Sequence, residues 1–117
     1  MLMFSASMAA RTDVANAFTL AYIKGVRDYV TAFQKKGPNR AEIVQILVDM
    51  KVLANAGLAD ELRYTGLNPN GYVNAEDLKQ AQDFLAEKGV VTQRAELDKA
   101  IDNRFVENAI RVLGEYK

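Results

Sequence analysis

Apolar side chains recur at steps of three or four residues through the first third of the chain, which is the spacing of one helix face. The positions that share this spacing are Val14, Phe18, Tyr22, Val26, Tyr29 and Phe33. Thr12 and Asp13 offer capping side chains in front of them, and Gly37-Pro38 follows as a stop signal. The pattern predicts one continuous helix over residues 14–36, with this stripe facing the core. Gly25 lies mid-helix, where glycine costs about 0.5–1 kcal/mol relative to alanine, so we interpret it as a place where another backbone approaches closely.

Further helices follow from the same periodicity and from side chains that cap helix ends. The predicted spans are 39–51 behind Asn39, a short helix from Leu58 that includes Leu62, 74–89 between Asn74 and Gly89, and a last helix capped by Asp102 or Asn103. The uncharged apolar run Met1–Phe4 is interpreted as a short strand. The sequence therefore predicts a mainly α fold of four to five helices, with one short N-terminal strand, in a single domain over residues 1–117.

The clearest loop is Asn68-Pro69-Asn70-Gly71, whose residue order is that of a type I turn. The segment Gly66–Asp77 also matches the spacing of a calcium-binding loop, because Gly71 falls at the glycine position and three asparagines fall at ligand positions. Its first position is Gly66 and its twelfth is Asp77, which leaves one carboxylate for a doubly charged ion. A proline-initiated turn leading into a capped helix explains the same residues without a metal, and we favour that interpretation.

The amino-acid composition argues against several classes of function. Basic and acidic residues number 15 each, so no net field attracts phosphate backbones, and we expect no nucleic-acid partner. The chain has no cysteine and no histidine, which excludes a disulfide, a thiol nucleophile and an imidazole base. The paired carboxylates are interpreted as solvated or helix-capping groups. These pairs are Asp60-Glu61, Glu76-Asp77 and Asp83 with Glu87. We therefore predict a protein that is not an enzyme and has no cofactor or metal.

Charged residues also interrupt the most hydrophobic region, so no stretch approaches the roughly 20 apolar residues that cross a bilayer. We expect no membrane insertion. The segment Met1–Ala10 is short and has no leading charge, unlike a secretory signal. The chain as written is therefore predicted to be cytoplasmic.

Four segments resemble the C-terminal region of solute-binding proteins that serve ABC importers for nitrate, sulfonate, taurine or thiamine precursors. They are Asp13–Phe18, Ala21–Tyr29, Gly66–Asn74 and Ile101–Val106. The third looks like that family's glycine-leucine-aspartate-proline-aspartate-glycine turn, with Asn68 and Asn70 where the family tends to have aspartates. Members of the family are longer and have two lobes that close on a small ligand.

The resemblance implies that this chain is a C-terminal fragment that lacks the first lobe's sheet and the whole second lobe. It places residues 1–5 at the segment that returns from the second lobe, with Phe4 and Ser5 as candidate ligand-facing residues. The full-length parent would be periplasmic and would deliver an anionic or heterocyclic solute to an ABC permease, while the fragment alone would bind little. Helices that should cover a sheet expose an apolar face, so a homo-oligomer is expected. The alternative is a stand-alone helical module that binds a protein partner.

Overall fold

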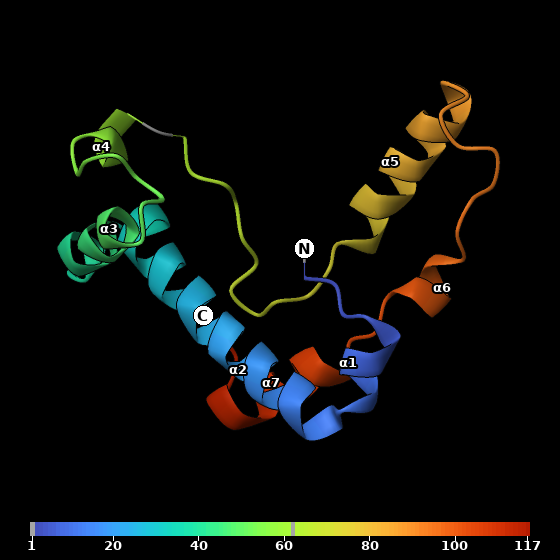
Figure 1. Cartoon of the computed structure of the whole chain (residues 1–117), viewed down its shortest axis with the longest axis horizontal. Coiled ribbons are helices and arrows are strands. Elements are labelled where there is room, and N and C mark those ends of the chain that lie inside the picture. Colours follow the sequence, from blue (N-terminus) through green and yellow to red (C-terminus); the bar gives the residue numbers. More distant parts are fainter. Residues whose placement is uncertain (1, 62) are drawn as a thin grey trace.

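Helices form every regular element in the part of the chain that the computed structural model describes, residues 2–61 and 63–117 (Figure 1). They are α1 (Ala6–Ala10), α2 (Thr12–Tyr29), the π-helical turn η1 (Val30–Gln34), α3 (Arg40–Asp49), α4 (Leu58–Glu61), α5 (Ala75–Glu87), α6 (Leu97–Ala100) and α7 (Arg104–Leu113). The predicted mainly α fold is confirmed. Each helix expected from periodicity is present, and the short helices α1 and α6 are additional.

The N-terminal strand prediction is wrong for residues 2–4, which adopt no regular structure; Met1 lies outside the described residues, as does Leu62 of the predicted short helix. A strand needs a neighbour for its backbone groups, and the described residues contain none. Phe4 instead packs its ring edge-on against Phe18 and Phe105, with centroids 5.9 and 5.4 Å apart. Ser5 caps α1, because its Oγ accepts a hydrogen bond from the N–H of Met8.

Helices α2 and α7 pack against each other and form the first of two small cores. The α2 face that is buried consists of Ala15, Thr19, Ile23 and Val26. This face lies beside the predicted stripe, and Phe18 on that stripe is 49% exposed. The small side chains of Ala15 and Ala109 are both fully buried, which is how the two helices can come close. Thr19 satisfies its buried hydroxyl by donating to the carbonyl of Ala15 at 2.8 Å.

The second core lies at the other end of the long helix, where η1, α3 and α4 meet. Its buried residues are Ala32, Phe33, Val44, Leu53 and Ala59. Phe33 stacks on Tyr64 with ring centroids 4.1 Å apart, and Tyr29 lies beside both rings. The long helix thus carries one core near each end.

Two expectations about helix ends and one about Gly25 are corrected. Helix α2 begins at Thr12 without a side-chain cap, because α1 runs into it through Arg11. Asn39 makes no capping bond to α3; its amide donates to the carbonyl of Asp28 instead. Gly25 has nothing within 4 Å of the place where a Cβ would stand, so no backbone approaches it. The caps predicted at α5 are confirmed: Asn74 Oδ1 accepts from two N–H groups, and Gly89 follows with a φ of 69°.

The helices are spread out instead of packing into one compact body. In Figure 1 the long helix α2 runs from α1 and α7 at its lower end to α3 and α4 at its upper end. Helix α5, drawn in gold, lies apart from α3 and α4, at the upper right of the view. The radius of gyration is 16.9 Å, compared with about 13 Å for a compact domain of this length. The accessible surface is 8488 Å², about 2,100 Å² more than a compact protein of this mass exposes. The chain therefore has far more surface than its size requires.

Candidate functional site

The turn Asn68–Gly71 is the loop that reaches the first core. The N–H of Gly71 donates to the carbonyl of Asn68 at 2.9 Å, which confirms the predicted turn. Gly71 has a φ of 79°, and a Cβ there would lie 2.9 Å from Cδ1 of Ile23 and 3.6 Å from Val106. Glycine is thus required both by the backbone angle and by the close contact with α2.

The asparagine oxygens that the calcium interpretation assigned as ligands accept hydrogen bonds from protein groups. Asn68 Oδ1 accepts from the N–H of Asn70 at 2.9 Å. Asn70 Oδ1 accepts from Arg27 at 3.1 Å and from the N–H of Tyr116 at 2.8 Å. Asn74 Oδ1 caps α5. Among the described residues, no group of three or more carboxylate side chains gathers as a metal-binding set.

Arg27 joins three parts of the chain at this turn. Its Nε donates to the carbonyl of Pro69 at 3.1 Å, and Nη2 donates to Asn70 Oδ1 at 3.1 Å and to the carbonyl of Gly114 at 2.6 Å. A longer bond of 3.4 Å runs from Nη1 to the carbonyl of Leu113. The planar guanidinium suits this role, because it presents five donors in a fixed fork. We call this set (Arg27, Pro69, Asn70 and residues 113–116) the Arg27 latch.

Tyr116 completes the latch on the surface of the long helix. Its hydroxyl lies 2.7 Å from Thr31 Oγ1, and its ring lies 4.3 Å from the ammonium of Lys35 and 5.6 Å from the guanidinium carbon of Arg27. These cation–π contacts are favourable because the ring face is negative. The C-terminal segment is therefore fastened along α2 and η1.

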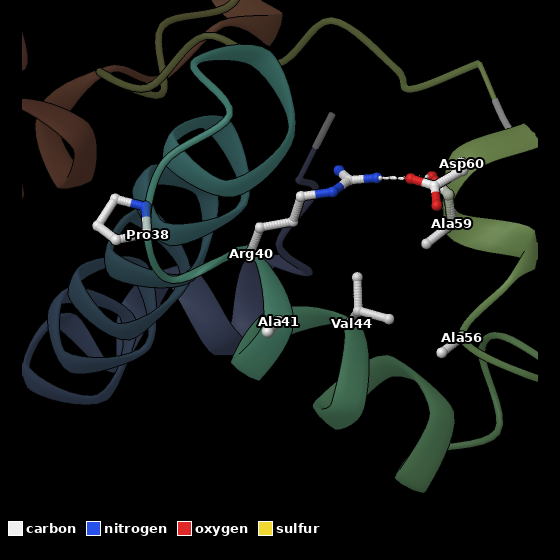
Figure 2. A pocket seen from close by; sticks show the side chains of 7 residues that line it. All are labelled: Pro38, Arg40, Ala41, Val44, Ala56, Ala59 and Asp60. Atoms are coloured by element: carbon white, nitrogen blue, oxygen red, sulfur yellow. Dashed lines mark hydrogen bonds and ion pairs between the residues drawn. The ribbon is translucent and has the colours of Figure 1, made fainter.

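A shallow groove of about 380 Å³ separates α3 from α4 (Figure 2). Its lining residues are Pro38, Arg40, Ala41, Val44, Ala56, Ala59 and Asp60. Figure 2 shows Arg40 reaching across to Asp60, and the two side chains form an ion pair at 2.6 Å. This hydrogen bond raises the pKa of Arg40 above its ordinary value. The guanidinium also lies 5.0 Å from the ring of Phe33 and donates to the carbonyl of Ala59. Its charge is thus engaged in holding α4 against α3.

A second groove, of about 340 Å³, lies between α5 and the segment that returns from it. Its lining residues are Leu78, Ala81, Gln82, Leu85, Val91, Gln93, Ala95 and Leu97. Gln82 bonds both the N–H and the carbonyl of Ala95, at 2.7 and 3.3 Å. Asp83 pairs with Arg94 at 2.7 Å and with Lys79 at 3.5 Å, and these partners lower the pKa of that carboxyl. We call residues 75–100, which carry this groove, the α5 arm.

The sequence-predicted site residues lie apart from both grooves. Phe4 is half-buried in the aromatic contacts described above, and Ser5 is exposed at the start of α1. Their ligand-facing role stays a prediction. Sequence reasoning did not identify the Arg40–Asp60 pair, because its two members are 20 residues apart and no local spacing connects them. The latch was also missed, because the partners of Arg27 are 42 to 87 residues away in the sequence.

Comparison of the chain with protein-family profiles, with curated proteins and with solved structures gave no match. Within the described ranges, none of the helices has the length and apolar character needed to cross a bilayer.

Proposed function

We propose that this chain is the helical C-terminal part of a solute-binding protein for an ABC importer, and that its role is to cover and brace a ligand-binding lobe. The observation that carries the proposal is the open architecture, with about 2,100 Å² of surplus surface. Large apolar side chains are exposed on several helices: Phe18 on α2, Ile46 on α3, Phe84 and Leu85 on α5, and Val112 on α7. Helices normally bury such faces against a second layer of structure, and a sheet is the layer that the resemblance supplies.

The latch supports the same proposal, because it involves the segments that carry the resemblance. Arg27 belongs to Ala21–Tyr29, and its acceptors Pro69 and Asn70 belong to Gly66–Asn74. Gly71 packs between Ile23 and Val106, the latter from Ile101–Val106. Short motifs that are far apart in sequence and meet in space fit one structural unit better than a separate chance similarity of each motif.

In this proposal the chain does not perform chemistry and carries no cofactor. The solute, a small anionic or heterocyclic molecule, would be held elsewhere in the full-length parent, which would pass it to an ABC permease from the periplasm. The helices contribute stiffness, because α2 with its latch and its two cores forms one continuous brace.

The DNA upstream of Met1 tests the proposal. We expect an in-frame continuation that encodes a signal peptide and two lobes. A stop codon and a promoter directly ahead of Met1 would overturn it. Calorimetry of the 117-residue chain with nitrate, taurine and a pyrimidine is the second test. Each titration should give no binding heat up to millimolar ligand, and micromolar affinity for any of them would show that the chain holds a solute site by itself.

The second groove, between α5 and the segment that returns from it, favours a second candidate function. This candidate is a stand-alone helical module that binds a protein partner. The groove is lined mainly by leucine, valine and alanine, which suits an apolar helix face better than a small charged solute. An upstream stop codon together with a specific protein complex formed through α5 would favour this candidate.

A further inference from the structure

The α5 arm has little packing support from the rest of the described chain. Helices α5 and α6 bury no residue, whereas the shorter α7 buries Phe105 and Ala109 against α2. Phe84 is 57% exposed, and Leu85 and Val90 are exposed beside it. A helix of 13 residues is marginal in water when nothing packs against it. The arm therefore needs a covering partner to be stable in this form.

Several polar side chains of the arm are already paired with other residues of the arm. Lys79 and Arg94 both pair with Asp83, and Gln82 is tied to Ala95. Phe84, Leu85 and Val90 stay exposed and apolar, so a covering partner must offer a matching apolar face. The chain as a whole has a net formal charge of zero, but residues 75–100 hold six acidic and four basic side chains. Burial of apolar surface must therefore outweigh a weak repulsion between two arms.

The surplus surface matches what a dimer requires. Obligate dimers bury about 2,000–5,000 Å² in total. If each of two copies covered half of its surplus of about 2,100 Å², the interface would reach the lower end of that range. A symmetric dimer also uses the same patch twice, so a self-complementary apolar helix is a sufficient contact.

We propose that a second copy of this chain covers the α5 arm, with the two α5 helices antiparallel across a twofold axis near Ala81. The small side chain of Ala81 is exposed and lets the helices come close at the axis. Antiparallel pairing about this point brings Leu78 of one copy beside Phe84 and Leu85 of the second copy. This inference concerns the 117-residue chain itself and does not depend on the proposed function.

Sedimentation velocity from 1 to 200 µM gives the first test. We expect a concentration-dependent species of about 26 kDa, twice the mass of 13.0 kDa. Phe84→Glu should raise the dissociation constant at least tenfold, because it buries a charge at the interface. Val112→Glu is the matched control, since Val112 is 63% exposed but lies on α7, and it should leave the constant unchanged. Circular dichroism of both variants checks that their helices persist.

A disulfide test locates the axis and does not depend on those variants folding equally well. The chain has no cysteine, so Ala81→Cys introduces a single thiol in each copy. Under mild oxidation we expect a disulfide-linked dimer, because the two Cβ atoms at the axis would come within about 4 Å. Ala21→Cys, exposed on α2, is the control and should remain largely unlinked.

Three results would each overturn the dimer. They are a wild-type monomer at 200 µM, an equal change of the dissociation constant in Phe84→Glu and Val112→Glu, and equal disulfide linkage of the two cysteine variants. Those outcomes leave the upstream-DNA test of the proposed function untouched. Conversely, a stop codon upstream of Met1 leaves the dimer untouched, so the two proposals fail separately.

Discussion

Replacing Arg27 with methionine should destabilise the chain by about 3 kcal/mol. Methionine has a similar length and fills the same space, but it has no donor. The variant loses three good hydrogen bonds, to the carbonyls of Pro69 and Gly114 and to the side chain of Asn70, besides the longer one to Leu113. A bond from a charged donor contributes about 1.5–3 kcal/mol when buried. We take about 1 kcal/mol for each good bond, because the site is only part-buried and water can reach the released acceptors.

Thermal unfolding followed by circular dichroism, at one fixed protein concentration, is the assay. A chain of 117 residues loses about 4 °C of melting temperature per kcal/mol, so Arg27→Met should melt about 12 °C lower. Arg27→Lys keeps the charge, but its single nitrogen cannot bridge acceptors in three segments, so most of the loss should remain. Lys24→Met, exposed on the same helix, should change little. An Arg27→Lys variant as stable as wild type would refute the reasoning, because charge alone would then explain the role of Arg27.

Three other predictions follow from single positions. Gly25→Ala should stabilise by about 0.5–1 kcal/mol, because alanine favours the helix and the added methyl meets open space; a lowered melting temperature would show an unseen contact at that position. Gly71→Ala should destabilise by about 2 kcal/mol or more in urea unfolding, since it combines a left-handed backbone with a Cβ 2.9 Å from Ile23. Arg94→Gln should raise the pKa of Asp83 toward its ordinary value, as measured by NMR titration, because Arg94 is the main cause of the lowered pKa. The pairing of Asp83 stabilises the folded state at pH values above the ordinary carboxyl pKa. This contribution is lost as the pH falls through the lowered pKa of the folded state.

Periodicity and capping were enough to predict the helices, because both act within four residues along the chain. Asn74 and Gly89 mark the two ends of α5 as expected, and Gly37 follows the end of η1. These local rules gave wrong predictions where a tertiary contact competed with the local interaction. Asn39 turned its amide to the carbonyl of Asp28 instead of capping α3. The buried face of α2 moved from Phe18 to Ala15 and Thr19, because close packing of α7 favours small side chains over a stripe of large ones.

The candidate sites were much less predictable. The Arg40–Asp60 pair and the Arg27 latch connect residues about 20, 43 and 87 positions apart, and no sequence spacing specifies such pairs. The turn at Asn68–Gly71 was predictable from its own residues, but its contact with Ile23 was not, because that contact depends on where α2 lies. The prediction for Phe4 and Ser5 rested on resemblance, and the structure gives each a local packing or capping role.

The contrast between the α5 arm and the long helix also implies uneven local stability. No residue of α5 is buried, while α2 is fastened by two cores and by the latch. Opening the arm would break few tertiary contacts, so it can unfold as a unit while α2 stays folded. In hydrogen exchange, we therefore expect the amides of α5 to exchange orders of magnitude faster than those at the centre of α2. The chain would behave as two cooperative units in one sequence, and whatever covers α5 would be detected first as protection of its amides.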